Sequence, residues 1–487
     1  MREPLKLEPL FPDRSTGEPL AVQLVRRLRE AIESGSFAAG TKMLGSRQLA
    51  KRLGLGRNTV ALAFEQLTAE GYLEARSGSG TFVAATGLAR RQLEPAGEIG
   101  AFEGAQRFAG LRAHFKTAAG EGALRPGMPA LALFPVSAWR RATRRALDEM
   151  RDLGYGHASG LRELRDAIAV HVRQFRGISA RPEQIIVVEG AQAAMHLANL
   201  VLTRAGDTIA IEDPAYALAR AAFEGDGLHL HPLRVDHDGA QTDALPAHAR
   251  LAFVTPTHQF PLGGTLPLAR RLELLAWAKR RDAYILEDDY DSEFTARARP
   301  LPALQSLDRD ERVIYIGSFS KTLAPGIRTG YVIAPPHLAS AFRTARANTS
   351  LGVSLQTQAA LAIFLREGHF ARHIRRMNAV YERRRAMLAR ALVPLDGTFT
   401  CGPMQVGLHM ALVAKEPFDD RAVARALAGQ RLVALSSLCI ERTDCCGFVL
   451  GFTNGSDAEV EAAAHSLVTV ASRLSFERRR LQERRIP

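Results

Sequence analysis

Residues 46–83 read SRQLAKRLGLGRNTVALAFEQLTAEGYLEARSGSGTFV, and this stretch decides the fold of the N-terminal part of the chain. Ser46 is a residue type that caps helices, and the apolar residues after it recur at helical spacing. A Gly-Leu-Gly turn then leads into a second helical pattern over residues 57–70. The stretch therefore predicts two helices joined by a tight turn.

The residues on either side complete a domain. An earlier helix is predicted over residues 19–34, because its apolar residues also follow a helical period. Two short strands, 72–76 and 81–83, are predicted around a turn rich in Ser and Gly. This order of elements predicts a winged helix-turn-helix domain over residues 15–84.

Basic residues collect around the predicted turn. The whole chain carries 64 Lys plus Arg against 51 Asp plus Glu, a formal charge of +13, and the run from Lys42 to Arg57 contains no acid. A helical hairpin with solvated cations is the plain alternative, but a winged helix with cations on its third helix favours double-stranded DNA as a partner. The predicted DNA contacts are Arg47, Lys51, Arg52, Arg57, Asn58, Thr59 and Ser79.

The quoted stretch resembles the winged-helix domain of the GntR-type transcriptional regulators. It departs from their usual pattern at Leu44 and Gly45, where Pro-Ser is common, and at Gly56, where a capping Ser is common. These departures affect phosphate contacts and the start of the third helix rather than the fold.

The rest of the chain has another character. Residues 85–114, rich in Ala and Gly, are predicted to be a linker, and residues 115–487 form a second domain. Apolar strand runs alternate there with helical patterns, which predicts an α/β fold with a mostly parallel sheet between helices. The runs are 185–188, 208–211, 251–254, 284–286, 313–316 and 331–333. A small α+β subdomain is expected over about 370–487.

Chemically active residues follow several of these strands. Lys321 lies in a small-residue turn, Asp288 ends a strand run, and Gly190 opens a helix whose N–H groups suit a phosphate. Each signal alone is weak, since a surface lysine or a loop acid explains it equally well.

In their order and spacing these motifs resemble fold type I aminotransferases, which use pyridoxal 5'-phosphate (PLP). The resemblance implies that Lys321 carries the internal aldimine, Asp288 pairs with the pyridine nitrogen, Tyr290 bonds the phenolic oxygen and Tyr216 stacks on the ring. It assigns the phosphate to Gly190, Ala191, Gln192, Ser318 and Arg328. Tyr155 is similar to the tyrosine that reaches the neighbouring subunit's phosphate, which implies a homodimer, although a core aromatic is the alternative.

Two positions depart from the aminotransferase pattern. Phe260, in THQFPLGG, replaces the asparagine that usually contacts the phenolic oxygen, so His258 or Gln259 would have to substitute. Cys446 stands where we expect the arginine that holds a substrate's carboxylate, and Arg442 is the nearest cation. The two departures count against full turnover.

A winged helix, a linker and an aminotransferase-like domain together resemble the MocR subfamily of GntR-type regulators. The resemblance implies a dimeric transcriptional regulator that senses PLP or a small amine; a working aminotransferase with an attached DNA-binding domain is the alternative. We expect a cytoplasmic protein, because neither a secretory signal nor an apolar span is evident. The sequence contains no Cys-x-x-Cys pair with the spacing of a zinc site, so no metal site is expected. The four cysteines are expected to be reduced.

Overall fold

The computed structural model describes residues 7, 10–85, 122–151, 154–295, 301–350, 352–403 and 405–483, with side chains up to residue 472. The described residues belong to two compact units, one before and one after the predicted linker. The predicted linker, residues 85–114, lies outside the described residues apart from residue 85. None of the helices described is both long and apolar enough to cross a membrane.

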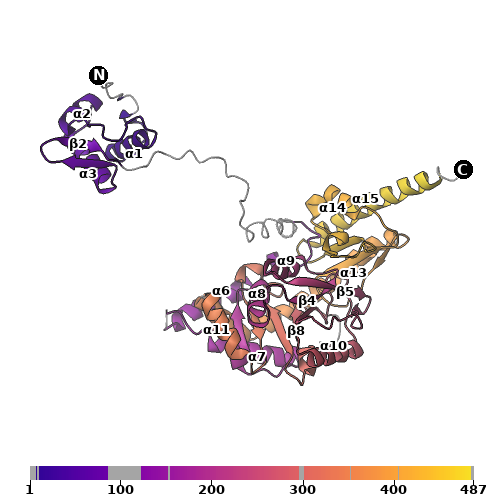
Figure 1. Ribbon diagram of the computed structural model, residues 1–487. Helices are drawn as coiled ribbons and strands as arrows, with labels where there is room; N and C mark the ends of the chain where they lie inside the picture. Colours follow the sequence, from indigo (N-terminus) through magenta and orange to yellow (C-terminus); the bar gives the residue numbers. More distant parts are fainter. Residues whose placement is uncertain are drawn as a thin grey trace. The chain divides into compact units, whose positions relative to one another are not determined.

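The N-terminal unit has the predicted winged helix-turn-helix order (Figure 1). Its elements are α1 (Leu20–Glu33), α2 (Ser46–Leu53), α3 (Arg57–Ala69), β1 (Leu73–Arg76) and β2 (Gly80–Val83). The strands pair as an antiparallel hairpin, and the three helices bury one apolar face each in a common core. That core includes Leu24, Leu28, Leu49, Val60 and Leu67, all without exposed surface.

Glycines rather than side-chain caps mark the ends of α2 and the start of α3. Ser46 was expected to cap α2, but Gly45 occupies the N-cap and Ser46 is the first helical residue. Gly54 ends the helix in the left-handed conformation, with φ of 65°, which glycine adopts without steric cost. Gly56 is the N-cap of α3 and offers no side-chain acceptor to its first turn.

The C-terminal unit is built on an eight-stranded sheet in the order β3-β10-β9-β8-β7-β4-β5-β6. The strands are β3 (Ile185–Val188), β4 (Thr208–Asp213), β5 (His229–Asp236), β6 (Gly239–Ala240), β7 (Leu251–Val254), β8 (Tyr284–Asp289), β9 (Val313–Ser318) and β10 (Gly330–Ile333). Strands β9, β8, β7, β4 and β5 are parallel neighbours. Strand β10 runs antiparallel to both β9 and β3, so the sheet is mostly parallel, as predicted, and β3 still runs in the direction of β9. The carboxyl ends of β3, β4, β7, β8 and β9 therefore meet at one edge.

Helices cover both faces of this sheet (Figure 1). On one face α8 (Ala191–Leu202), α9 (Ala217–Gly225) and α11 (Ala339–Thr349) pack against the even-numbered residues of β3 and β9. On the other face lie α6 (Val136–Glu149), α7 (Arg162–Arg176), α10 (Leu268–Arg281) and α12 (Leu355–Arg366). The sheet is thus buried on both sides, as its continuous apolar strands require.

A smaller α+β subdomain follows the long helix α13 (His369–Leu392). Its four-stranded sheet is antiparallel, in the order β11-β12-β14-β13. The elements are β11 (Phe399–Cys401), β12 (His409–Ala414), α14 (Asp420–Ala426), β13 (Val433–Ala434), β14 (Gly447–Gly451) and α15 (Asp457–Glu483).

Candidate functional site

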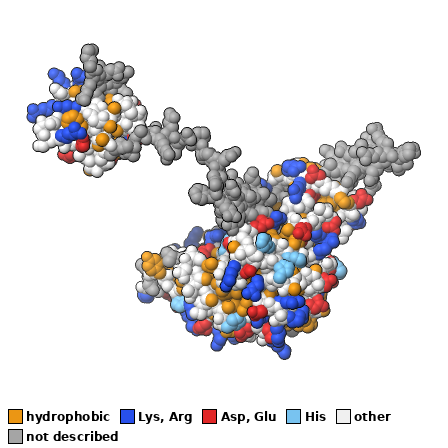
Figure 2. All heavy atoms as spheres, in the orientation of Figure 1, with side chains coloured by type: hydrophobic (Ala, Val, Ile, Leu, Met, Phe, Trp, Pro, Cys, Tyr) orange, Lys and Arg blue, Asp and Glu red, His pale blue; other side chains and the backbone are white. Residues whose placement is uncertain are grey.

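The amino terminus of α3 forms a basic, exposed surface on the N-terminal unit. Arg57 and Asn58 are the first two residues of α3 and are exposed, and Thr59 is partly exposed. Arg47, Lys51 and Arg52 on α2 are also exposed, and no carboxylate of the described residues forms an ion pair with these cations. Figure 2 shows Lys and Arg side chains gathered on the visible face of this unit. Unpaired cations at a recognition helix are what phosphate binding needs.

Two further basic side chains, Arg76 of β1 and Lys42 beside β2, lie near the turn between the two strands and were not predicted as DNA contacts. Ser79 lies exposed in the turn between β1 and β2, where its N–H bonds the carbonyl of Arg76 at 2.9 Å. The guanidinium of Arg76 and the ammonium of Lys42 lie 4.6 and 5.7 Å from the ring centroid of Phe82. Because Lys42 and Arg76 are 34 residues apart in the sequence, their shared contact with the Phe82 ring could not be predicted.

Lys321 follows β9 at the carboxyl edge of the large sheet. Its Nζ donates a hydrogen bond to the carbonyl of Gly127 at 2.6 Å, so the segment before α6 covers the lysine. Burial lowers the pKa of Lys321, the nearby Asp291 and Asp288 act in the opposite direction, and Arg125 lowers it further. A lowered pKa makes the unprotonated, nucleophilic amine more accessible near neutral pH.

Among the three consecutive acids of β8, only Asp288 is left for a ligand. Glu287 and Asp289 share one face of the strand, because side chains alternate along it. The backbone N–H groups of residues 304 and 305 bond the Glu287 carboxylate at 2.8 Å. Asp289 pairs with Arg176 at 2.5 Å and accepts the Tyr315 hydroxyl at 2.6 Å.

The side chain of Asp288 points to the opposite face of the strand, and its surroundings favour the protonated carboxyl group. Its Oδ1 is buried and has no hydrogen-bond partner among the described residues. Burial, and then the charge of Asp289, raise the pKa of Asp288 to about 7, while Lys321 acts to lower it. A buried, unsatisfied carboxylate oxygen is costly, so it marks a place where a polar ligand atom belongs.

Tyr216, Arg328 and the start of α8 complete this end of the sheet. Burial raises the pKa of Tyr216, and the charges of Asp288 and Arg328 act on the same hydroxyl, so the three side chains share one neighbourhood. Gly190 is the N-cap of α8 with φ of 108°, and the space that a side chain would occupy there is open. The free N–H groups of that helix end can therefore approach an anion.

Two other phosphate candidates are placed as follows. Ser318 is partly exposed at the end of β9, and its Oγ accepts the N–H of Ser320 at 3.1 Å. Gln192 donates to the carbonyl of Leu218 at 2.8 Å, and its Oε1 is buried without a partner in the described part of the chain. Ala191 is the first residue of α8, beside Gly190.

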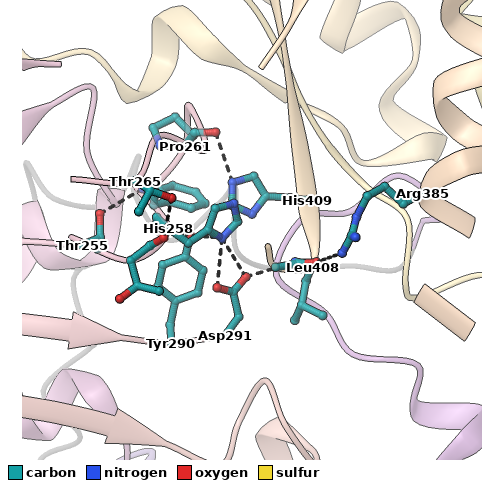
Figure 3. A network of polar contacts seen from close by, with 12 residues as sticks. Thr255, His258, Pro261, Thr265, Tyr290, Asp291, Arg385, Leu408 and His409 are labelled. Carbon is teal, nitrogen blue, oxygen red and sulfur yellow. Dashed lines mark hydrogen bonds and ion pairs between the residues drawn. The ribbon is translucent and has the colours of Figure 1, made fainter. Parts of the chain in front are cut away.

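Tyr290 belongs to a buried polar network that sequence reasoning found only in part (Figure 3). Its hydroxyl lies 3.0 Å from His258 Nδ1 and donates to the His258 carbonyl at 2.9 Å. Asp291 bonds the same Nδ1 at 3.0 Å and accepts the N–H of Leu408 at 3.0 Å. The rings of His258 and His409 lie side by side, with centroids 4.6 Å apart.

His409, from β12, was missed because its only sequence signal is a lone histidine in an apolar strand. Its Nε2 donates to the carbonyl of Pro261 at 3.1 Å, and burial, followed by the charge of His258, lowers its pKa to about 3. The ring is therefore neutral near pH 7. The potential ligand atoms of His258, Asp291 and His409 lie within 4.8 Å of one another, a spacing that a metal ion could also use.

Gln259 is not brought toward Lys321. Its amide nitrogen contacts the carboxylate of Glu212 at 3.2 Å and the carbonyls of residues 214 and 260, and its oxygen accepts the N–H of Leu262. These hydrogen bonds of Gln259 stabilise the loop that follows β7. Of the two expected substitutes for the missing asparagine, only His258 lies beside Tyr290.

The side chains of Arg442 and Cys446 also bond backbone carbonyls of the protein itself. Arg442 pairs with Asp444 at 3.0 Å and donates to the carbonyl of Val235 at 3.0 Å. The Cys446 thiol bonds the carbonyl of Glu416 at 3.7 Å, just before β14. The cation whose charge acts on Lys321 is instead Arg125, more than 300 residues earlier, where no motif pointed to it.

Phe260 stands at the centre of an apolar wall. Its ring meets those of Tyr216 and His409 edge-on, at centroid distances of 5.7 and 5.1 Å. Val449, on β14, is buried in the cluster of apolar side chains against which Phe260 packs. Tyr155, by contrast, is 84% exposed in the single chain, which rules out the core-aromatic alternative.

The fold and the site define a class: a winged-helix DNA-binding unit carried by a chain whose larger unit has the aminotransferase architecture. Residues 20–83 match the family "Bacterial regulatory proteins, gntR family", and residues 127–467 match "Aminotransferase class I and II". The chain is 40% identical to the probable rhizopine catabolism regulatory protein MocR of Rhizobium meliloti, over 86% of both chains. It is 35% identical to the pyridoxine biosynthesis transcriptional regulator PdxR of Corynebacterium glutamicum, over 86% of this chain and 89% of that one.

Among solved structures, the chain resembles LysN, an α-aminoadipate aminotransferase of Thermus thermophilus complexed with N-(5'-phosphopyridoxyl)-L-leucine. The TM-score is 0.69 at 24% identity, and the match covers 77% of this chain and 98% of LysN. This chain belongs to the GntR family, in its MocR-like group with an aminotransferase class I and II domain. It is a DNA-binding transcriptional regulator of that type.

Proposed function

We propose that the C-terminal unit binds PLP at Lys321, and that occupancy by the cofactor or by a small primary amine changes the affinity of the N-terminal unit for promoter DNA. The observation that carries this proposal is the convergence of Lys321 and Asp288 at one edge of the sheet. Asp288 has a buried oxygen without a partner in the described part of the chain, while the acids on either side of it are fully used. Pairing with a protonated pyridine nitrogen would satisfy that oxygen.

The remaining residues fit the same group. Gly190, with the first N–H groups of α8, together with Ser318 and Arg328 would hold the phosphate, and Tyr216 would cover the ring. When bound, PLP supplies an aldehyde carbon that condenses with amines and gives a visible absorbance. Lys321, with its lowered pKa, offers the unprotonated amine that this condensation requires.

The wall beside this site indicates the class of effector. Phe260 and Val449 are apolar, Cys446 stands where the arginine that holds a substrate's carboxylate is expected, and Arg442 is committed to Asp444 and Val235. An amine with an apolar portion would pack against Phe260. Arg125 is the cation whose charge acts on the pKa of Lys321. Such an amine would compete with Lys321 for the cofactor without requiring turnover.

Coupling to DNA requires two arrangements of the protein that bind the ligand with different affinity. We propose that the protein acts as a homodimer in the cytoplasm, with Tyr155 of one subunit serving the phosphate site of the other. Its exposure in the single chain supports this role. Two winged helices would then read paired half-sites in the chain's own promoter region.

The test is a PLP titration of the cofactor-free protein, followed by visible absorbance, alongside gel-shift binding to its upstream DNA. Wild type should give a visible band and a cofactor-dependent shift in DNA affinity, whereas Lys321→Ala should give neither. Lys279→Ala is a matched control, because Lys279 is an exposed lysine on α10 that pairs with Asp310. A visible band that persists in Lys321→Ala would overturn the assignment of the lysine.

The alternative function, a working aminotransferase, is tested in the same preparation. Retention of Lys321 and Asp288 favours it, so amino donor and keto acid should be supplied together and product followed with time. Sustained turnover at about 1 to 1,000 per second, the usual range for enzymes, would make catalysis the principal activity. A single equivalent of product per site would fit the regulator.

A further inference from the structure

The loop between Leu438 and β14 places two thiols together at the edge of the apolar wall. The sulfur of Cys439 lies 3.7 Å from the carbonyl oxygen of Cys445, so the two residues are in direct contact, and each thiol shifts the pKa of the other. Cys439 is partly exposed, while Cys445 is buried in the cluster that includes Val449 and Phe260. Neither thiol has a part in the proposed cofactor site, and both cysteines are free in the structure.

The same loop holds the segment that leads to Tyr216. The backbone N–H groups of residues 440, 441 and 442 all donate to the carboxylate of Asp213, at 2.8, 2.9 and 3.0 Å. The N–H of Ala215 bonds the carbonyl of Leu438 at 3.1 Å. Any change in the shape of residues 439–445 is therefore transmitted to the backbone immediately before Tyr216.

We propose that Cys439 and Cys445 form a reversible thiol–disulfide switch that responds to low-molecular-weight disulfides and alters the site beside Tyr216. In the net reaction the two thiols lose two protons and two electrons and form one S–S bond. The small disulfide accepts both and is released as two thiols. Intracellular disulfides of this kind are usually transient and serve redox sensing, which suits a regulator.

The direction of attack follows from the neighbouring groups. The contact between the thiols raises the pKa of Cys439 and lowers that of Cys445; burial opposes the lowering and Arg442 adds to it, so Cys445 is the better nucleophile for the second step, while exposure decides which sulfur is reached first. The partly exposed Cys439 is the sulfur that a small disulfide reaches first, and Cys445 then displaces the small thiol from it. Cys446 does not take part, because its thiol bonds the carbonyl of Glu416.

The chain offers a direct way to detect the bond. Trypsin cleaves after Arg442, between the two cysteines, so an oxidised loop joins peptide 432–442 to peptide 443–473. The full-length protein would be treated with oxidised glutathione, alkylated, digested without reduction and analysed by mass spectrometry. The linked pair should form in wild type, in Cys446→Ser and in Cys401→Ser, and dithiothreitol should remove it.

Cys439→Ser and Cys445→Ser should each abolish the linked pair, and circular dichroism would verify that both variants fold. Absence of linkage in wild type, or a link that survives in Cys445→Ser, would overturn the proposed pair. This part of the test does not depend on PLP.

The effect on the site, which rests on the proposed function, is measured separately by PLP titration before and after oxidation. We expect the half-saturating concentration to change about five-fold or more in wild type, the lower end of usual coupling strengths, and to stay constant in Cys445→Ser. Linked peptides with unchanged PLP affinity would overturn the coupling to the site while supporting the thiol pair. Linked peptides in a protein that never binds PLP would instead overturn the proposed function.

Discussion

Asp288 is buried at a position where its ionised carboxylate destabilises the folded protein. The pKa of Asp288, about 7, lies above the ordinary value of 3.8. Between these two pH values the folded cofactor-free protein therefore keeps a proton on Asp288 that the unfolded chain has lost. The cost of the buried charge is absent below pH 4, grows between pH 4 and 7, and is complete above pH 7. Asp288→Asn should therefore stabilise the cofactor-free protein at high pH, by at most about 4 kcal/mol.

Urea unfolding followed by tryptophan fluorescence measures this effect, because both tryptophans, Trp139 and Trp277, lie in the C-terminal unit. The gain should be present at pH 8 and absent at pH 4. Asp282→Asn is the control, since Asp282 is 78% exposed and should show no such pH dependence. Equal stability of Asp288→Asn and wild type at both pH values would contradict the buried-acid interpretation.

Arg57 provides the corresponding prediction for DNA. As the first residue of α3 it is positioned to contact a base edge, so Arg57→Ala should weaken binding to a specific site by about 1 to 3 kcal/mol. Gel-shift titrations with promoter and random DNA of equal length measure the difference. Arg26→Ala is the control, because Arg26 lies on α1 and pairs with Glu18. An equal loss on both DNAs would reduce Arg57 to a phosphate contact.

Single residues also show what the sequence can and cannot decide. Asp288 could be separated from its neighbours by strand alternation alone, once β8 is extended through residue 289. Gln259 and Arg442 could not be placed, since their partners, Glu212 and Val235, are 47 and 207 residues away and come together only through the fold. The same holds for Arg125 and His409, which no local motif identifies.

At the scale of elements, strands with continuous apolar runs were predicted well, and polar or short strands were not. The predicted runs at β3 and β7 match the observed bounds without change. Strand β5, with the sequence HLHPLRVD, alternates polar and apolar residues around a proline and was missed. The reversed direction of β10 depends on its long-range pairing with β3 and β9, and hydrophobicity carries no information on strand direction.

The start of α3 is the element that sequence changes can most directly strengthen. Gly56 has φ of −65° and ψ of 141°, which any residue adopts, and a Cβ there would make only ordinary contact with Thr59. Gly56→Ser should supply the missing acceptor for the first turn and stabilise the helix by a few tenths of a kcal/mol. Hydrogen exchange of the amides of residues 58 and 59 measures this, and we expect exchange about two-fold slower. Gly45→Ser is a useful comparison, since α2 also lacks a side-chain cap; unchanged exchange in both variants would show that these helix ends are not fraying.

For the whole molecule, the central question is whether each PLP site is built from one chain or two. Tyr155 is exposed in the single chain, whereas Lys321 is covered by Gly127. If the proposed dimer is correct, Tyr155→Ala damages the site of the partner and Lys321→Ala damages its own. Because a two-fold interface exchanges equivalent residues, one subunit of each kind leaves one site with both defects and one site intact.

Mixing the two variants therefore gives a test that neither variant provides alone. After subunit exchange at equal concentration, half of the dimers should contain one intact site, so visible absorbance should return at about one quarter of the wild-type amplitude. The PLP concentration should be one at which Tyr155→Ala alone shows no band. A control mixture of Lys321→Ala with Lys321→Ala carrying Tyr155→Ala should stay colourless, because it contains no functional lysine. If the first mixture also stays colourless after co-purification of differently tagged subunits verifies that mixed dimers have formed, each site is complete within one chain and Tyr155 has no role in the partner's site.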